Sequence, residues 1–397
     1  MHILVADAFP ESGLEHLTGG GHQVSYQPAL TDVGTALDGI EVLVVRSTRV
    51  DAGAIARGTD LSLIVRAGAG TNNIDKAAAA ARAVYVSNVP GRNAVAVAEL
   101  TLGLILAIDR RIPDNVADLR VGAWNKRRYS DGTGLWGRRL GIVGLGAIGR
   151  AVAIRARAFG LTLHGLDKPR HPTTRRELGD LGFALHPDLT ALAASVDILS
   201  LHVPASPETR HLVDANLLGA LAPGSVLINT SRADVVDEAA LLLALDTGDL
   251  WAGLDVFADE PAGGDGTIES ALARHPRVYG THHIGASTAQ AQAAVADGVL
   301  EVIDAFTAGT VLNCVNLQPH IPDTTRITVR HRDRVGVLAS ILMHIRDAGL
   351  NVEHMSNLVF EGAEAASATI DLKGPVTAEL LERLAELPDV IHARRNS

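Results

Sequence analysis

A glycine-rich segment near the middle of the chain constrains the fold more than any other feature. The run GLGAIG, from Gly144 to Gly149, follows the apolar stretch LGIV and precedes an Ala-rich stretch with helical spacing. Gly144 permits a tight turn, Gly146 lets backbone approach a pyrophosphate, and Gly149 lets a helix pack closely on a strand. The helix N-terminus would supply N–H groups to the phosphates. The segment therefore predicts a strand–turn–helix unit that binds a dinucleotide.

The residue that closes the next apolar stretch predicts which dinucleotide is bound. Asp167 ends the stretch LTLHGLD. A carboxylate at this place can accept hydrogen bonds from a ribose 2′-hydroxyl and would repel a 2′-phosphate. Lys168 and Arg170 follow directly and weaken that preference slightly. NAD rather than NADP is therefore the expected cofactor.

Short β-rich runs alternate with Ala-rich helical runs along most of the chain, which is typical of an α/β fold with parallel sheets. An apolar helix from about Asn93 to Ile108 separates two such α/β regions, and a second Ala-rich helix, from Ser287 to Thr307, could carry the chain back to the first. We expect a discontinuous flavodoxin-like substrate domain over residues 1–98 and 284–314. An NAD-binding Rossmann domain, residues 99–283, is inserted into it.

The C-terminal part has a different pattern. VNLQPHIPDT looks like a linker over residues 315–324, because Pro319 and Pro322 fit neither a helix interior nor a central strand. Residues 325–397 then alternate as strand, helix, strand, strand, helix, strand. That order predicts a ferredoxin-like βαββαβ domain.

Composition excludes several classes of function. The net charge of −10 argues against nucleic acid as a partner. The longest apolar run, from Ala94 to Ile108, is shorter than the roughly 20 residues of a membrane span and contains Glu99, so no membrane partner is expected. A single cysteine, Cys314, and an N-terminus unlike a signal peptide predict a cytoplasmic protein. No metal site is predicted.

Three apolar strands in the second half of the chain end in polar residues that suit one reaction. They deliver Arg232, Glu260 and His283 to the strand C-termini, which line the ligand crevice of an open α/β sheet. An arginine can hold a carboxylate and polarise a C2 oxygen, and a histidine can exchange a hydroxyl proton near neutral pH. A carboxylate beside the imidazole would orient it and favour imidazolium. This set predicts interconversion of 2-hydroxy and 2-oxo acids.

The same segments resemble the signature segments of the D-2-hydroxyacid dehydrogenase family, in the order that the family has them. They are GIVGLGAIGR, SLHVPASPETRHLV, NTSRADVVDEAAL, GLDVFADEP and HHIGAST. The resemblance implies that Arg232, Glu260 and His283 are catalytic. It also implies that NAD is bound by the glycine motif and Asp167 together with further residues, with Asp255 near the nicotinamide amide. The full set is Gly144, Gly146, Ala147, Ile148, Gly149, Asp167, Thr230, Ser231 and Asp255. The chain has His282 where the family usually has proline and Ala233 where it usually has glycine. His202 is expected to be a structural histidine near the cofactor.

The N-terminal segments VVRSTRV, VRAGAGTNNID and GRNAVAVAELTLG resemble the substrate-binding segments of phosphoglycerate dehydrogenases in that family. The resemblance implies contacts with a phosphorylated hydroxy acid from Arg46, Ser47, Arg66, Gly68, Asn93 and Lys126. It also implies oxidation of 3-phospho-D-glycerate to 3-phosphohydroxypyruvate, the first step of serine biosynthesis. Charge-assisted bonds from arginine and lysine suit a phosphate dianion. Two alternatives stay open: a reductase of 2-oxoglutarate, hydroxypyruvate or glyoxylate, and a non-catalytic NAD(H)-sensing binding protein.

The C-terminal domain resembles an ACT domain, a module that often binds an amino acid at a subunit interface. The match is in HRDRVGVL, from His331 to Leu338. It implies an allosteric site with His331, Asp333 and Asn351, in which Asp333 stands where serine-inhibited relatives have asparagine. That extra carboxylate would repel the carboxylate of serine, so the effector stays open, as does a role in oligomerisation alone. A homodimer or homotetramer is expected.

Overall fold

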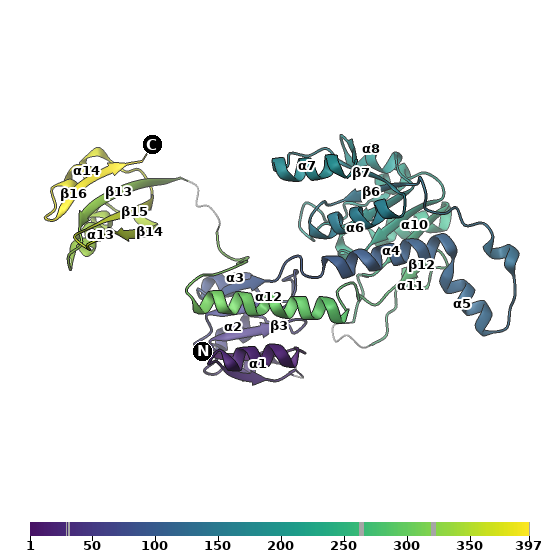
Figure 1. Ribbon diagram of the computed structural model, residues 1–397, viewed down its shortest axis with the longest axis horizontal. Helices are drawn as coiled ribbons and strands as arrows, with labels where there is room; N and C mark the ends of the chain where they lie inside the picture. The colour runs from purple at the N-terminus through teal and green to yellow at the C-terminus, as the bar shows by residue number, and fades with distance from the viewer. Residues whose placement is uncertain (29, 31, 262–265, 319–322, 397) are drawn as a thin grey trace. The chain divides into compact units, whose positions relative to one another are not determined.

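The chain forms two compact units, Met1–Asn316 and Leu317–Ser397, in the computed structural model (Figure 1). The structure describes residues 1–28, 30, 32–261, 266–318 and 323–396. Pro319 and Pro322 of the predicted linker lie outside the described residues. The predicted domain boundaries stay predictions, and the one at residues 98 and 99 falls inside a helix, α4 (Ala94–Arg110).

The first sheet has five parallel strands in the order β2-β1-β3-β4-β5, which is the flavodoxin-like order. The strands are β1 (His2–Val5), β2 (Gln23–Tyr26), β3 (Val42–Val45), β4 (Leu63–Arg66) and β5 (Tyr85–Asn88). Apolar residues on both faces are buried, since α2 (Ala52–Arg57) and α3 (Lys76–Ala81) cover one face. The other face is covered by α1 (Glu11–Gly19) and by α12 (Ala289–Thr307), which comes from the far end of this unit.

The second sheet has seven parallel strands in the order β12-β11-β10-β9-β6-β7-β8. The strands are β6 (Arg139–Val143), β7 (Thr162–Leu166), β8 (Ala184–His186), β9 (Ile198–Leu201), β10 (Ser225–Asn229), β11 (Leu250–Leu254) and β12 (Val278–Gly280). The chain runs outward from β6 to β8 and then returns to β9 on the other side of β6. This reversal is the topological switch point of a Rossmann fold, where dinucleotides bind.

Two helical layers bury this second sheet. One face packs against α4 and α6 (Ala147–Ala158). The other face packs against four shorter helices: α8 (Leu189–Ala194), α9 (Ala215–Ala220), α10 (Glu238–Thr247) and α11 (Ala271–Arg274). A further helix, α7 (Pro172–Asp180), precedes β8.

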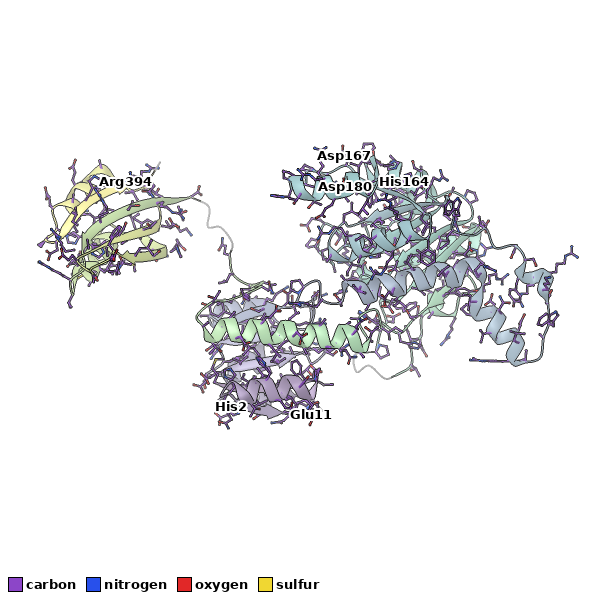
Figure 2. All side chains as sticks on the ribbon, in the orientation of Figure 1. His2, Glu11, His164, Asp167, Asp180 and Arg394 are labelled. Atoms are coloured by element: carbon purple, nitrogen blue, oxygen red, sulfur yellow. The ribbon has the colours of Figure 1, made fainter. Side chains whose placement is uncertain are left out.

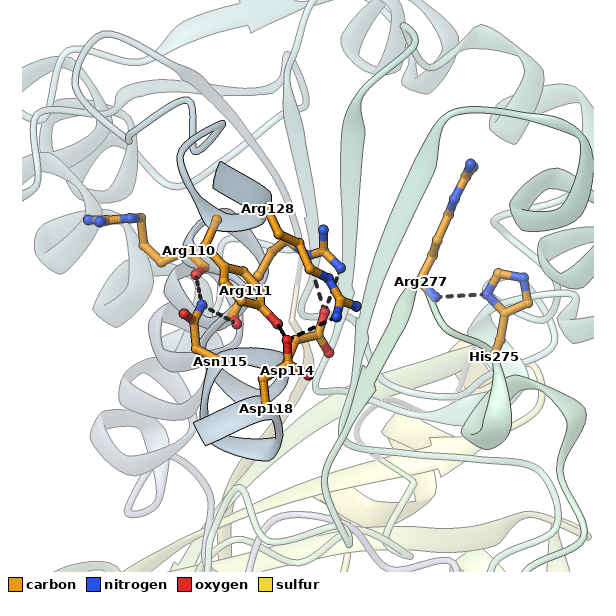
Figure 3. A network of polar contacts seen from close by, with 9 residues as sticks. Arg110, Arg111, Asp114, Asn115, Asp118, Arg128, His275 and Arg277 are labelled. Carbon is orange, nitrogen blue, oxygen red and sulfur yellow. Dashed lines mark hydrogen bonds and ion pairs between the residues drawn. The ribbon is translucent and has the colours of Figure 1, made fainter. Parts of the chain in front are cut away.

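The predicted apolar helix is confirmed as α4, which is followed by a polar network. Arg111, with φ 48°, ends α4 and begins α5 (Ile112–Arg120). Its guanidinium donates to Asp114 at 2.7 Å (Figure 3). The same guanidinium lies over the rings of Tyr129 and Trp251. Nearby, η2 (Lys126–Tyr129) is joined to Asp118 by two side-chain bonds. Within the described residues, no helix is long and apolar enough to cross a membrane.

The C-terminal unit has the predicted element order. Its elements are β13 (Thr324–Arg332), α13 (Val337–Asp347), β14 (Asn351–Val359), β15 (Ala365–Lys373), α14 (Ala378–Ala385) and β16 (Val390–Arg395). The antiparallel sheet has the order β14-β15-β13-β16, and both helices pack on one face of it. This is a ferredoxin-like arrangement.

Candidate active site and dinucleotide site

The three glycines after β6 have two different roles. A Cβ at Gly144, whose φ is 97°, would overlap the carbonyl oxygen of His202, and a Cβ at Gly149 would overlap that of Gly144. Close packing therefore requires glycine at both positions. At Gly146, which precedes α6, an added Cβ would meet no described atom within 4 Å. Gly146 thus leaves open space beside the free N–H groups of the first turn of α6, as a bound pyrophosphate requires.

Asp167 lies directly after β7, where a ribose would be bound (Figure 2). Its carboxylate is half exposed, and its Oδ1 is 3.9 Å from Nη2 of Arg175. Arg170 folds back to donate to the carbonyl oxygens of Leu166 at 2.7 Å and Lys168 at 3.2 Å. The carboxylate is therefore free to accept hydrogen bonds from a ligand.

His202 follows β9 at the switch point and is buried. Its Nε2 is 2.8 Å from Oγ of Ser200, and its Nδ1 has no partner among the described residues. Burial lowers the pKa of His202 to about 4. The ring is therefore neutral near pH 7, as a structural histidine beside the glycine turn would be.

His283 and Glu260 form a pair in which Nδ1 of the imidazole is 2.7 Å from Oε2 of the carboxylate. The other oxygen of Glu260 accepts from the N–H of Phe257 at 2.8 Å. Partial burial would raise the pKa of Glu260, but these two hydrogen bonds and the charges of His283 and Arg232 outweigh it, and the pKa lies below its usual value. An ionised carboxylate only accepts hydrogen bonds, so Nδ1 carries a proton and Nε2 is free to take one.

His283 has an unusual backbone conformation, with φ 52°, and Asp255 supports it. The buried Asp255 carboxylate accepts three hydrogen bonds: Oδ1 from Oγ1 of Thr281 at 2.6 Å and from the N–H of Ile284 at 2.9 Å, and Oδ2 from the N–H of Gly285 at 2.9 Å. Its carbonyl oxygen accepts from the N–H of His283 at 2.8 Å. Asp255 therefore fixes the segment on both sides of the histidine.

Arg232 is placed by a short turn after β10. Oδ1 of Asn229 accepts from the N–H and the hydroxyl of Ser231, and Nδ2 of Asn229 donates to the carbonyl oxygen of Arg232. Thr230 is buried, and its hydroxyl is 2.9 Å from that of Thr101 on α4. The guanidinium of Arg232 lies so close to Gly70 that a Cβ there would overlap its Nη2. Arg232 follows β10 of the second sheet and lies against Gly70, which follows β4 of the first sheet.

Three arginines form a positively charged cluster at the carboxyl ends of the strands. Burial, then the charges of Arg232 and Arg46, lower the pKa of Arg66 to about 10, and only Asp7 acts in the opposite direction. Oδ2 of Asp7 accepts from the N–H groups of Arg46, Ser47 and Thr48, so this carboxylate shapes the loop after β3. Nε of Arg66 is buried and has no partner in the described part of the chain. An anion would satisfy this cluster.

Arg46, Arg66 and Asp7 line one cavity of about 1430 Å³, which exceeds what a small acid fills and so describes an open cleft. Arg232 is not among the described residues that line it. Most of the predicted substrate and catalytic residues line it: Arg46, Ser47, Arg66, Gly68, Asn93, Glu260 and His283. Oδ1 of Asn93 is buried there without a partner among the described residues. The N–H of Gly68 donates to the carbonyl oxygen of Arg66, so it is not available to a substrate.

Lys126 is not brought to this cleft. It lies on η2, is exposed, and is absent from the cleft lining in the described ranges. Asp7 is the residue that the sequence interpretation missed. Its position directly after the first apolar run could have revealed it, since carboxyl ends of parallel strands meet at one edge of a sheet.

Comparison with known proteins agrees with this geometry. The sequence profile of the NAD binding domain of D-isomer specific 2-hydroxyacid dehydrogenases matches residues 102–285. A D-3-phosphoglycerate dehydrogenase from Methanocaldococcus jannaschii is 34% identical over 92% of this chain and 68% of its own length. The chain belongs to the D-2-hydroxyacid dehydrogenase family. It is therefore an oxidoreductase with an NAD-binding domain.

Other members of the family differ in substrate and cofactor. A hydroxypyruvate reductase from Thermotoga maritima is 40% identical over 66% of this chain and 84% of its own length. The solved structure of an NADPH-dependent glyoxylate/hydroxypyruvate reductase from Sinorhizobium meliloti has a TM-score of 0.66 and 31% identity, covering 79% of this chain and 96% of that one. Membership in the family therefore leaves the substrate to be argued from the cleft.

The residues expected to bind an effector lie in the C-terminal unit of this dehydrogenase. His331 is buried, with Nδ1 2.8 Å from the carbonyl oxygen of Arg332 and Nε2 3.2 Å from Oδ1 of Asn357. Asp333 and Asn351 are exposed, and Nδ2 of Asn351 donates to Glu353. Only the last two side chains are accessible from solvent.

Proposed function

We propose that this chain is an NAD-dependent D-3-phosphoglycerate dehydrogenase, which oxidises 3-phospho-D-glycerate to 3-phosphohydroxypyruvate. The observation that supports this most strongly is the arginine cluster of Arg46, Arg66 and Arg232, whose three positive charges are offset only in part by the carboxylates of Asp7 and Glu260. A simple hydroxy acid has one carboxylate and needs one of these cations. A carboxylate and a phosphate dianion together use all three.

The proposed chemistry follows from the roles that these side chains can take. Arg232 holds the substrate carboxylate and polarises the C2 oxygen, and Nε2 of His283 takes the hydroxyl proton. Glu260 stabilises the resulting imidazolium, because its carboxylate is 2.7 Å from Nδ1. The nicotinamide, when bound, accepts the hydride from C2. Arg46, Arg66 and Asn93 hold the phosphorylated end, with Ser47 beside them.

NAD would be held by three groups of residues at the switch point. Gly144, Gly146 and Gly149 with the first residues of α6, Ala147 and Ile148, face the pyrophosphate, and Asp167 faces the adenosine ribose. Thr230, Ser231 and Asp255 remain predicted contacts near the nicotinamide. The oxygens of Asp255 already accept three bonds, so any contact with the carboxamide must use a remaining lone pair.

The remaining expectations are part of this proposal. The βαββαβ unit is proposed as an ACT domain that binds an amino acid, and the enzyme as the entry step to serine in the cytoplasm. A homodimer or homotetramer is supported by α5, which buries no residue within the described chain and exposes Ile112, Val116 and Leu119 on one stripe.

The experiment is a substrate comparison that follows NADH absorbance. The purified protein is given 3-phosphohydroxypyruvate, 2-oxoglutarate, hydroxypyruvate or glyoxylate. We expect the phosphorylated acid to have the highest kcat/KM, and Arg46→Gln to raise its KM about 10- to 100-fold, since one charge-assisted contact is lost. Arg82→Gln removes an exposed arginine that ends α3, shortly before the amino end of β5, and that is not among the described cleft residues, so KM should be unchanged.

Each other result has a definite meaning. Preference for 2-oxoglutarate, whose two carboxylates could use the same arginines, or for hydroxypyruvate, as in the Thermotoga maritima relative, would keep the family and overturn the substrate. Tight NADH binding without turnover of any of the four acids would favour an NAD(H)-sensing protein over an enzyme.

A further inference from the structure

The surroundings of Asp167 contain more positive charge than an NAD site needs. Lys168 and Arg170 follow it, and Arg175 lies on α7 with Nη2 3.9 Å from Oδ1 of the carboxylate. The segment from Asp167 to Arg175 therefore carries one negative charge and three positive charges, and Arg175 is the cation with a measured distance to the carboxylate. The nearest acid on α7, Glu177, is turned toward Arg150 on α6 at 3.5 Å and does not offset them.

The pairing between Asp167 and Arg175 is loose. The side chain of Arg175 is 73% exposed and that of Asp167 is 55% exposed. An exposed ion pair at this distance contributes little stability, so either partner can turn to another group at small cost. Arg170 differs, because two bonds to backbone carbonyl oxygens hold its guanidinium under the turn that follows β7.

We propose that this dehydrogenase binds NADP(H) as well as NAD(H), and that Arg175 is the residue that permits both. With NAD(H), Asp167 accepts hydrogen bonds from the ribose hydroxyls, and Arg175 remains in solvent. With NADP(H), Arg175 and Lys168 contact the 2′-phosphate, and the fixed charge of Arg170 lowers its repulsion by Asp167. A phosphate dianion carries about two negative charges, which matches the net excess at this place.

The proposal rests on the dinucleotide site and not on the substrate proposed above, so a binding experiment on the full chain tests it without any oxo acid. Dissociation constants for NADH and NADPH are measured by the fluorescence of the reduced nicotinamide. Titration calorimetry with 2′,5′-ADP and with AMP then isolates the contribution of the 2′-phosphate. We expect NADPH to bind within about tenfold of NADH, and its affinity to fall more steeply with added salt.

Two variants and a control separate the roles of the charges. Arg175→Gln should weaken binding of NADPH and of 2′,5′-ADP about 10- to 100-fold and change that of NADH and AMP by less than about threefold. Asp167→Asn should weaken NADH and strengthen NADPH. Arg176→Gln removes a neighbouring exposed charge from the same helix and should affect neither cofactor by more than about threefold.

Two outcomes would overturn the proposal. One is a wild-type chain that binds NADH but binds NADPH more than about a thousandfold more weakly. The other is an Arg175→Gln variant that weakens both cofactors equally, which would make Arg175 a structural residue of α7. Failure of every oxo acid to turn over would refute the proposed substrate and leave these binding results intact.

Discussion

Replacing Gly70 by alanine should displace the guanidinium group of Arg232 without altering its charge. Gly70 has a backbone conformation outside the left-handed region, so alanine can adopt it. The new Cβ would lie well inside 3.0 Å of Nη2 of Arg232 but 3.5 Å from Cζ and 3.9 Å from Nε. Only the terminal nitrogen is in the way. The guanidinium must therefore turn or shift by about 1 Å to restore ordinary contact.

The expected effect on activity is large and the effect on stability is small. A misplacement of about 1 Å in a group that orients the substrate costs about 100-fold in rate. The conflict involves the end of a flexible side chain, which can move into the cleft, so the free energy of unfolding should change by less than about 1 kcal/mol. Loss of kcat/KM with an unchanged melting temperature is therefore the expected signature.

The assay compares Gly70→Ala with Gly103→Ala. Gly103 lies in α4, and a Cβ there would meet no described atom within 4 Å, so this control should keep full activity. Both variants are assayed for kcat/KM with the best oxo acid and for thermal unfolding. If Gly70→Ala keeps kcat/KM within about threefold of the unmodified protein, the guanidinium does not act from the position that the structure gives it, and the reasoning about Arg232 is refuted.

Three further predictions follow from individual contacts. Asp255→Asn places an amide N–H opposite the N–H of Gly285. The free energy of unfolding in urea should therefore fall by about 1–3 kcal/mol, and kcat should fall at least about tenfold. A variant with unchanged stability and kcat would show that the three hydrogen bonds to Asp255 do not position His283. Glu260→Gln keeps a hydrogen-bonding group beside His283 but removes the negative charge that favours imidazolium. Steady-state assays should show a kcat/KM about 10- to 100-fold lower. Full activity would exclude Glu260 from the reaction. Burial lowers the pKa of His202 to about 4 in the folded chain, whereas the unfolded chain has the ordinary histidine pKa of about 6.5. Between these two pKa values the unfolded state binds more protons than the folded state. The free energy of unfolding therefore falls as the pH falls from about 6.5 to about 4. The free energy of unfolding from denaturant titrations should therefore include a loss of about 2 kcal/mol between pH 7 and pH 5 that His202→Asn abolishes; equal pH dependence in both proteins would contradict it.

Local patterns were sufficient to predict the element order and the glycine turn. The roles of Gly144 and Gly149 follow from two neighbours in the sequence, a strand and a helix, and the structure places backbone atoms where their side chains would be. The order of the six C-terminal elements was predicted in the same way from runs of alternating and helical spacing. Local spacing of this kind is displayed directly by a single sequence. The atom that a Cβ at Gly144 would overlap, the carbonyl oxygen of His202, lies in a distant segment and could not be identified from the motif alone.

Contacts between distant segments were harder to predict. Asp7 shapes the Arg46–Thr48 loop only because β1 pairs with β3 and not with β4, and the sequence does not state that order. Asp255 was assigned to the cofactor by resemblance, yet its carboxylate accepts three bonds from Thr281, Ile284 and Gly285. Residue type predicted an acceptor at this place, and the fold decided which donors it meets.

The C-terminal unit shows how burial limits a role that is assigned by resemblance. His331 was expected to contact an effector, but it lies on the helix-covered face of the sheet, on the same face as Val329 and Ile327, which are completely buried. Both of its ring nitrogens already have partners, at Arg332 and Asn357. A ligand could bind to this ring only by displacing Asn357, at the cost of a buried hydrogen bond. Burial and these two contacts therefore argue against His331 as a direct effector contact in the described conformation, whereas the predicted residues Asp333 and Asn351 are exposed.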